Sequence, residues 1–389
     1  MVDDITPNAE DPAPLAGIRV IEFTHMVMGP SIGVILGDLG ADVIKVEPPQ
    51  GDRTRDLLGS GSGYFPMFNR NKRSICLDLK DARDLASAQE LCSGADVVIE
   101  NFRPGTLARL GLGYEDMARR NPGLIYCSAK GFLTGPYEDR TALDEVTQMM
   151  GGLAYMTGPP GRPLRAGSSV VDITGGMFGV IGILAALEQR HRTGKGSQVR
   201  CSLYETTAFL VGQHIAQKAV TGQAARPMPV RVSAWAIYDV FETAKADEQL
   251  FVGVVSDGQW QTFCETFGLT DFAANEKWAE NNERVKARDE ILPRIQALFK
   301  QHSRDELVAR LETCGLPFAP IARPDELVDD PHLNAAGGIV ELHLSDGTEV
   351  RLPSLPIEFD GRRPGLHRDL PAIDEHGDEI RAELSEHVR

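Results

Sequence analysis

Residues 14–47 read PLAGIRVIEFTHMVMGPSIGVILGDLGADVIKVE. Two short apolar runs, residues 18–23 and 42–47, have the length and composition of buried strands, and residues 31–40 between them have a helical pattern. Two strands that are joined through a helix run parallel to each other. Parallel sheets are covered by helices on both faces and bind ligands at the carboxyl ends of their strands. The stretch therefore predicts a Rossmann-like α/β domain with its ligand site at that edge.

The alternation of strands and helices continues toward the middle of the chain, which supports a mainly parallel sheet. The further elements are predicted strands at residues 74–79, 96–102 and 124–128 and predicted helices at residues 82–92 and 203–220. Residues 221–230 are polar and contain proline, which is typical of a linker.

A second, smaller α+β domain is predicted after this linker. It contains a strand at residues 250–256, helices at 258–267 and 284–300, and a further helix that opens with the capping-box spacing of Ser303 and Glu306. Short strands are expected near residues 339–344 and 349–352. The predicted boundaries are residues 1–205 and 325–389 for the large domain, 227–316 for the small domain, and 206–226 and 317–324 for linkers.

Charge and composition narrow the possible partners. The chain has 389 residues, of which 40 are Lys or Arg and 56 are Asp or Glu, so its formal charge is 40 − 56 = −16. This acidity argues against a nucleic-acid or membrane partner. The six cysteines are scattered without C-x-x-C spacing, which favours reduced thiols in a cytoplasmic protein. Residues 1–12 are acidic, lack the pattern of a signal peptide and are interpreted as a short flexible leader.

Asp172 is the main candidate for chemistry. It stands where an apolar run turns into a helix whose stripe comprises Ile173, Met177, Val180, Ile181, Leu184 and Leu187. The positive end of that helix favours the ionised, nucleophilic form of a carboxylate. An aspartate at this position is more commonly a plain helix cap, so the local pattern alone leaves both readings open.

Several established motifs are absent from the sequence. It contains no H-E-x-x-H, no paired Cys/His spacing, no G-x-S-x-G and no Walker A motif, which removes the usual support for metal, serine-esterase and nucleotide-hydrolase chemistry. The glycine-rich residues 59–63 do not match the dinucleotide fingerprint and are typical of a flexible loop.

Basic residues cluster next to the predicted strands. Segments 69–74, 100–105 and 129–132 each place Lys or Arg beside a turn, and residues 25–30 follow the first strand. Charge combined with exposed backbone amides binds phosphates, although each basic pair alone is typical of a solvated surface. Together on an acidic chain they predict a polyphosphate ligand, with Phe102 stacking on its adenine.

At the level of longer motifs the chain resembles the class III CoA-transferases, the formyl-CoA transferase and carnitine dehydratase/bile-acid-inducible type, which also include α-methylacyl-CoA racemases. The resemblance covers about residues 14–359 and is densest up to about residue 205. The motifs are PLAGIRVIEFTH (14–25), GADVIKVE (40–47), GDRTR (51–55), NKRS (71–74), VIENFRPGTL (98–107) and RTGKG (192–196).

The resemblance implies the site residues and the assembly. It assigns Asp172 as the nucleophile, and it implies two interlocked subunits with the small domain closing over the active site. Coenzyme A is then a substrate, and no metal or permanently bound cofactor is expected. The expected CoA-binding residues are Asn71, Lys72, Asn101, Phe102, Arg103, Arg109 and Lys130. The expected acid pocket comprises His25, Met26, Val27, Met28 and Phe132.

The implied reaction moves CoA from an acyl-CoA to a carboxylic acid. Asp172 attacks the thioester to form an aspartyl anhydride and CoA thiolate, and the thiolate then attacks the anhydride to form an aspartyl-CoA thioester. The acceptor acid then attacks the aspartyl-CoA thioester to form a second aspartyl anhydride, and the CoA thiolate attacks the acyl group of the acceptor to form the new acyl-CoA. Water must be excluded, because it would hydrolyse the anhydride.

Two departures from the family pattern bear on the substrate. Racemases have a histidine where Leu143 stands, so the alternative of an acyl-CoA racemase or isomerase lacks one of its two bases. Formyl-CoA:oxalate transferases have a glutamine where Val27 stands and four glycines where residues 255–259 read VSDGQ. These differences favour a short or medium acid or a dicarboxylate over oxalate. A catalytically silent CoA-binding protein is the remaining alternative.

Overall fold

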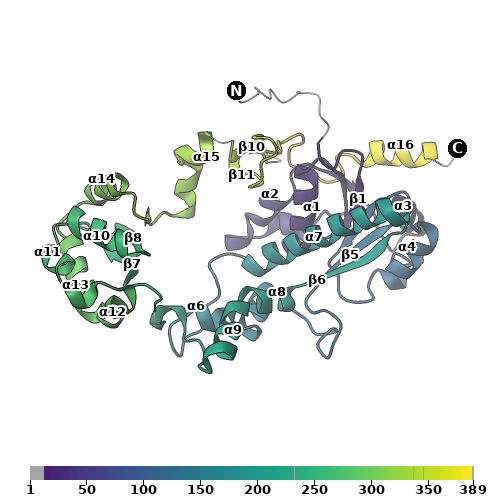
Figure 1. The fold of residues 1–389 in the computed structure, drawn as a ribbon. Helices are drawn as coiled ribbons and strands as arrows, with labels where there is room; N and C mark the ends of the chain where they lie inside the picture. Colours follow the sequence, from purple (N-terminus) through teal and green to yellow (C-terminus); the bar gives the residue numbers. More distant parts are fainter. Residues whose placement is uncertain (1–12, 232, 336, 345, 388–389) are drawn as a thin grey trace. The chain divides into compact units, whose positions relative to one another are not determined.

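The computed structural model describes residues 13–231, 233–335, 337–344 and 346–387 (Figure 1). The predicted leader, residues 1–12, lies outside this part of the chain. The chain divides into two compact units, of which the smaller spans Val230–Leu327 and the larger takes in the residues up to Pro229 and those from Val328 on.

The larger unit is built on a sheet of six parallel strands, as the alternating pattern predicts (Figure 1). The strands are β1 (Arg19–Phe23), β2 (Asp42–Glu47), β3 (Lys72–Cys76), β4 (Val97–Glu100), β5 (Ile125–Lys130) and β6 (Ser197–Ser202). Their order in the sheet is β3-β2-β1-β4-β5-β6. This is the doubly wound order, in which successive strands are added toward one edge of the sheet from β1 to β3 and toward the other edge from β4 to β6. Such folds bind ligands between β1 and β4, where the order reverses.

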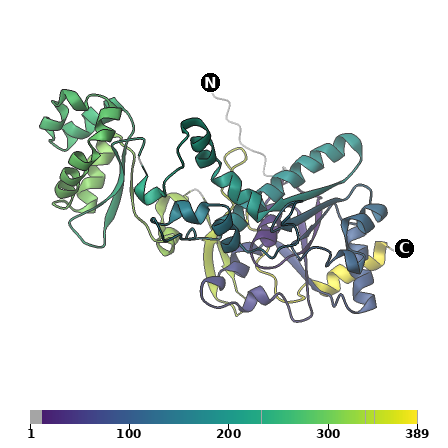
Figure 2. The ribbon, with the colours of Figure 1, turned by 90° about the horizontal axis from the view of Figure 1, so that it is seen from below.

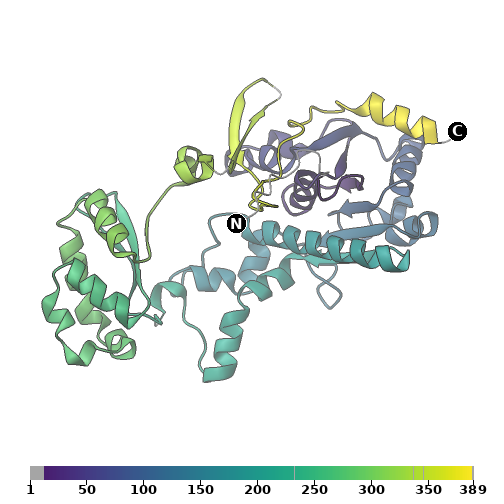
Figure 3. The ribbon, with the colours of Figure 1, turned by 45° about the horizontal axis from the view of Figure 1, so that its top comes forward.

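Alternate side chains of each strand build two cores on opposite faces of the sheet. In β1, Val20 belongs to the core under helices α1 and α7, whereas Ile21 belongs to the core under α3, α4 and α16. Helix α16, the yellow C-terminal helix in Figures 2 and 3, packs against α3 and β3. The helices of this unit are α1 (Met28–Asp38), α2 (Tyr64–Phe68), α3 (Ala82–Ser93), α4 (Tyr114–Arg120), α5 (Asp144–Met150), α6 (Leu153–Thr157), α7 (Val170–Thr193), α8 (Leu203–Leu210), α9 (Gly212–Thr221), α15 (Pro331–Ala335) and α16 (Gly377–His387).

Two predicted boundaries differ from the structure. Residues 206–226, predicted as a linker, mostly form the end of α8 and the whole of α9. The single helix predicted at residues 203–220 is two helices, which meet at Val211. Residues 317–324 contain the strand β9 (Phe318–Pro320), which pairs with β8 and therefore belongs to the smaller unit. The hairpin of β10 (Ile339–His343) and β11 (Glu349–Pro353) lies where the sequence predicts two short strands.

The smaller unit packs five helices against an antiparallel sheet of three strands. Its strands are β7 (Ile237–Glu242), β8 (Gln249–Val254) and β9, and its helices are α10 (Asp257–Thr266), α11 (Thr270–Ala273), α12 (Asn281–Lys286), α13 (Arg288–Phe299) and α14 (Arg304–Cys314). The predicted capping box is present at α14: the Ser303 hydroxyl accepts from the Glu306 amide, and the Glu306 carboxylate accepts from the Ser303 amide.

Helix α7 carries Asp172 and packs against α1, β5 and β6. Its predicted apolar stripe divides: Val180 and Leu187 are buried, whereas Met177, Ile181 and Leu184 are exposed. By length and composition α7 is the one helix in the described part of the chain that could cross a membrane, a test that core helices of soluble proteins also pass. The helix ends at Gly194, whose φ of 70° is the left-handed conformation that glycine adopts without strain.

Candidate active site

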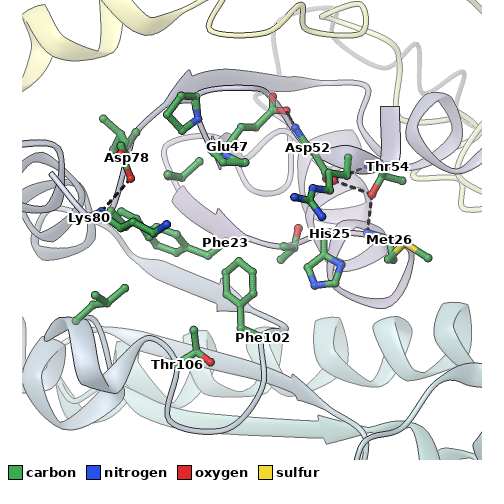
Figure 4. Close-up of a pocket in the computed structure, with 18 of the residues that line it drawn as sticks. Phe23, His25, Met26, Glu47, Asp52, Thr54, Asp78, Lys80, Phe102 and Thr106 are labelled. Atoms are coloured by element: carbon green, nitrogen blue, oxygen red, sulfur yellow. Dashed lines mark hydrogen bonds between the residues drawn. The ribbon is translucent and has the colours of Figure 1, made fainter. Parts of the chain in front are cut away.

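A cavity of about 850 Å³ opens at the carboxyl ends of β1, β2, β3 and β4 (Figure 4). This is the edge where the doubly wound order predicts a ligand. Most of the lining is apolar, from Phe23, Met26, Val46, Pro48, Pro49, Leu57, Leu77, Leu79, Phe102, Leu110 and Leu143. The polar lining includes Thr24, His25, Glu47, Asp52, Thr54, Asp78 and Thr106, together with the cations Arg53, Lys80 and Arg109.

The three cations at the cavity have free charged ends. Arg53, Lys80 and Arg109 form no ion pair or side-chain hydrogen bond within the described residues. Each belongs to a different connection: Arg53 follows β2, Lys80 follows β3 and Arg109 follows β4. Unpaired cations that converge on one cavity of an acidic chain form a binding site for an anion such as a phosphate.

Two aromatic rings form one wall of the cavity. The rings of His25 and Phe102 lie 5.6 Å apart, in a tilted arrangement (Figure 4). Asn101 fixes the backbone of His25, because its side chain accepts from the His25 amide at 3.1 Å and donates to the His25 carbonyl at 2.8 Å. Burial lowers the pKa of His25 below 6.5, with Asp52 opposing this shift. The predicted residues His25, Asn101 and Phe102 are thus brought together.

The turn after β1 is strained at Met26. Its φ of 64° is left-handed, a conformation that an L-residue with a long side chain rarely adopts. The Met26 amide donates to the Thr54 hydroxyl at 3.0 Å, and this hydroxyl donates to Asp52 at 2.7 Å (Figure 4). Strained backbone that is held by such contacts is common at binding sites.

Beneath this turn, buried charges form a connected network. Asp52 pairs with Lys45 at 3.0 Å, Lys45 lies 3.8 Å from Glu22, and Glu22 pairs with Lys72 at 2.8 Å. Lys72 is fully buried, and its burial lowers its pKa to about 8. The structure therefore places Lys72 inside the protein and away from the cavity, in contrast to the predicted contact with CoA.

Asn71 also lies away from the cavity. Its φ is 61°, and its side-chain oxygen accepts from the amides of His367 and Arg368 while its amide group donates to Asp38. The asparagine thus ties the C-terminal segment to the sheet. An Asn in the left-handed region with its side chain bonded to the backbone is a structural feature of turns.

Two further predicted CoA-binding residues line a separate, polar pocket of about 220 Å³. Lys130, at the end of β5, pairs with Glu100 at 2.6 Å and donates to the Phe102 carbonyl at 2.7 Å. Arg103 is exposed at the rim of the same pocket. Lys130 therefore supports the backbone of Phe102 from behind, while the ring of Phe102 faces the larger cavity.

Three residues of the predicted acid pocket are buried. Val27 is 1% exposed and belongs with Met28 to the core between α1 and α7. Phe132 packs its ring against Tyr137 and Tyr204. These three residues are not among those that line the cavity of about 850 Å³, and their part in binding the acid stays a prediction. Val27 and Met28 are buried because α1 begins at Met28, which turns its first side chains into the core.

Asp172 lies in the first turn of α7, but the groups around it differ from the sequence expectation. The amides of Val171 and Asp172 both donate to Asp144 Oδ2, at 3.0 and 3.2 Å. Burial and the charge of Asp144 raise the pKa of Asp172 to about 7, with Arg165 opposing the shift. The expectation that the helix end favours the ionised form is therefore wrong, because burial disfavours the charged carboxylate and, in addition, Asp144 occupies the positive end of the helix.

Leu143, next to Asp144, lines the cavity and is 61% exposed. It connects the cavity with the start of α7. The functional residues that the sequence reasoning missed are Arg53, Lys80 and Asp144. For Lys80 a signal existed, because it directly follows a predicted strand at its carboxyl end. For Asp144 the only signal is its place in residues 141–145, the segment that matches the His-Asp pair of racemases; its contact with α7 joins residues far apart in the sequence.

Other predicted features can be placed briefly. Residues 255–259 start α10, where the Ser256 hydroxyl accepts from the Gln259 amide and the Gln259 side chain accepts from the Val255 amide. All six cysteines fall within the described ranges, and each is a free thiol. Across those ranges, no three His, Cys, Asp or Glu side chains are grouped as metal ligands.

Comparison with known proteins places this site in a family. Residues 15–377 match CoA-transferase family III. The chain is 36% identical to a succinate–glutarate CoA-transferase of Agrobacterium fabrum, over 95% of this chain and 96% of the relative. It is 34% identical to an acetyl-CoA:oxalate CoA-transferase of Acetobacter aceti, over 98% of both chains.

A solved structure agrees with these matches. The crystal structure of a CAIB/BAIF family protein from Brucella suis superimposes with a TM-score of 0.85 at 34% identity, covering 96% of this chain and 100% of that one. The doubly wound sheet, the cation-lined cavity and the full-length matches lead to one assignment: the chain belongs to CoA-transferase family III and is a class III CoA-transferase.

Proposed function

We propose that this enzyme transfers CoA from an acyl-CoA to a short or medium carboxylic acid, with dicarboxylic acids as the preferred class. The observation that carries this proposal is the cavity with three unpaired cations, whose lining includes Leu143; the next residue, Asp144, accepts hydrogen bonds from the helix end that bears Asp172. The names of relatives that act on succinate, glutarate, mesaconate and citramalate support the dicarboxylic class.

The cavity suits the ADP part of coenzyme A. In the proposed arrangement the adenine lies against Phe102 among the apolar side chains, and the phosphates meet Arg53, Lys80 and Arg109. Leu143 marks the direction in which the pantetheine arm runs toward Asp172. Of the predicted CoA-binding residues, Phe102 and Arg109 keep a direct role in this proposal, while Asn101 and Lys130 support the wall.

The proposed chemistry uses Asp172 as a nucleophile. Its carboxylate attacks the thioester carbonyl, the C–S bond breaks, and an aspartyl anhydride and CoA thiolate result. The thiolate attacks the aspartyl carbonyl of the anhydride, releasing the first acid and leaving an aspartyl-CoA thioester. The acceptor carboxylate attacks this thioester, which releases CoA thiolate and forms a second aspartyl anhydride. The thiolate then attacks the acyl carbon of the acceptor, which forms the new acyl-CoA and releases the Asp172 carboxylate. No water is consumed at any step.

Racemisation is the second candidate, and Leu143 argues against it. A racemase needs a second base opposite Asp172 to move the α-proton. The alkyl side chain of Leu143 lines the cavity at the position that matches the histidine of racemases. An inert CoA-binding protein is disfavoured, because the Asp172 carboxylate has no partner among the described residues that would make it a structural group.

A second copy of the chain is the proposed partner. The large exposed apolar side chains of α7, α8 and α9 include Met177, Ile181, Phe209, Ile215 and Val220. Exposed apolar surface of this extent marks an interaction site. We assign it to the interlocked homodimer that the family resemblance implies. The reduced thiols and the acidic charge suit a cytoplasmic enzyme.

A panel of acids tests the activity. The purified enzyme is assayed with succinyl-CoA or acetyl-CoA as donor and with glutarate, oxalate and a monocarboxylate as acceptors. We expect new acyl-CoA for the dicarboxylates, and loss of at least about a thousandfold in kcat for Asp172→Asn, since an amide is a poor nucleophile. Exchange of the α-hydrogen with solvent deuterium in the absence of an acceptor acid would contradict the proposal and support racemisation.

A further inference from the structure

We propose that Asp144 is a positioning residue for the transfer reaction: it caps helix α7 from the neighbouring helix α5, which leaves the side chain of Asp172 free to attack. This inference rests on the proposed role of Asp172 as nucleophile. It adds a residue of this chain to the reaction without requiring that the residue touch the substrate.

The capping contact is well defined. Asp144 is the first residue of α5 and is 7% exposed. One carboxylate oxygen, Oδ2, accepts from the amides of Val171 and Asp172 at 3.0 and 3.2 Å. The other, Oδ1, accepts from the Gln148 side chain at 2.5 Å and lies 3.5 Å from Arg165. All the bonding capacity of Asp144 is thus used inside the protein.

The cap of α7 comes from a distant part of the chain, which is unusual. A helix is normally capped by the side chain that immediately precedes it. Here Ser169 precedes α7 and makes no capping hydrogen bond. Asp172, in the first turn, is itself suited to such a contact, but Asp144 has taken the amides. The Asp172 carboxylate therefore accepts no hydrogen bond and forms no ion pair within the described residues.

Asp144 also changes the charge that surrounds Asp172. The charged groups that face the start of α7 are Asp144 and Glu145 from α5 and Arg165 from the preceding loop. The other groups there are uncharged: Tyr64 of α2, which is bonded to Ser169, and Met28 and Ser31 of α1. After burial, the charge of Asp144 is the largest cause that raises the pKa of Asp172. A more basic carboxylate is the stronger nucleophile once it has lost its proton.

A purely structural role for Asp144 would have different consequences. If Asp144 only joined α5 to α7, its loss would lower stability and leave the ionisation of Asp172 unchanged. The isosteric change Asp144→Asn separates the two roles, because asparagine retains an oxygen that accepts from the helix amides but carries no charge. Glu145→Gln is the matched control, since it removes one carboxylate from the next position of the same helix, where the side chain is exposed.

The experiment measures the pH dependence of adduct formation at Asp172. The full-length wild type, Asp144→Asn and Glu145→Gln are mixed with succinyl-CoA, quenched after a single turnover between pH 5 and 9, and the adduct on the Asp172 peptide is quantified by mass spectrometry. In the wild type we expect the rate to be half-maximal near pH 7. In Asp144→Asn the midpoint falls by about one pH unit, and the plateau rate falls severalfold. Glu145→Gln keeps the wild-type midpoint.

Each result bears on a separate claim. An Asp144→Asn midpoint equal to that of the wild type, in an enzyme that still forms the adduct, would overturn the proposed role of Asp144 and leave the role of Asp172 as nucleophile unaffected. Absence of any adduct in the wild type at every pH would instead contradict the role of Asp172 as nucleophile and with it the proposed function. If Asp144→Asn does not fold, the wild type decides, because a midpoint near pH 4 would show that Asp144 does not perturb Asp172.

Discussion

Replacing Asp172 by asparagine is expected to stabilise the larger unit above pH 7 while it abolishes transfer. Burial and the charge of Asp144 raise the pKa of Asp172 from 3.8 to about 7. Between about pH 4 and pH 7 the folded chain therefore keeps a proton that the unfolded chain releases. The stability that this protonated group contributes is complete below about pH 4 and is lost as the pH rises through about 7. Asparagine does not ionise and avoids the loss.

The size of the effect follows from the same pKa. A rise from 3.8 to about 7 corresponds to a ceiling of about 4 kcal/mol in the free energy of unfolding. The Asp172 side chain retains some exposure to solvent, and the resulting screening reduces the expected gain to about 2 kcal/mol at pH 8. For a domain of this size this corresponds to a rise of about 4 °C in Tm. Near pH 4 the gain shrinks toward zero.

Calorimetry of both proteins at pH 4.5, 6 and 8 measures this gain. The three tryptophans, Trp235, Trp260 and Trp278, all lie in the smaller unit, so tryptophan fluorescence gives a separate melting curve for that unit. Asp139→Asn, a change at an exposed aspartate, is the control for general charge effects. A Tm difference that does not grow with pH, or an asparagine variant that is less stable at pH 8, would refute the assignment of a raised pKa to Asp172.

Three other substitutions test the site. Arg109→Ala should raise KM for CoA esters about tenfold and leave the preference among acids unchanged, which steady-state kinetics with two acceptors would show. Lys72→Ala should instead lower the free energy of unfolding by about 3 kcal/mol, because it removes the cation that is hydrogen-bonded to the buried Glu22 and leaves only Lys45, at 3.8 Å; a variant of wild-type stability in denaturant titration contradicts this. Val27→Gln should cost about 1–3 kcal/mol in the same titration, since it buries an amide, without improving oxalate use.

The strands could be predicted where both faces are buried. The runs at β1, β2, β4 and β5 are apolar because each strand contributes to both cores, and this composition is visible without any structure. The strand β6 (SQVRCS) was not predicted, because it lies at the edge of the sheet and its first residues are half-exposed and polar. Pairing with β5 makes it a strand, and this is a contact that composition does not record.

The start of α7 shows a second limit. The sequence identifies Asp172 as a residue in the first turn of a helix, and the structure agrees on its place. The sequence indicates neither the burial of Asp172 nor that Asp144 binds the same helix end, so the predicted direction of the pKa shift of Asp172 is wrong. A local pattern gives the position of a titratable group, whereas its ionisation depends on groups that the fold brings near it.

The distinction between structural and ligand-binding cations has the same origin. Both Lys72 and Lys80 are candidate anion-binding residues in the sequence, yet Lys72 is enclosed with Glu22, whereas Lys80 lines the cavity and has no ion-pair partner among the described residues. An enclosed cation needs a fixed counter-charge to offset the loss of water, so its charge is no longer available to a ligand. A cation at the cavity retains its water until an anion replaces it. Pairing within the chain therefore distinguishes structural cations from ligand-binding cations. Because Lys80 is not paired among the described residues, we assign it with Arg53 and Arg109 to the proposed phosphate site.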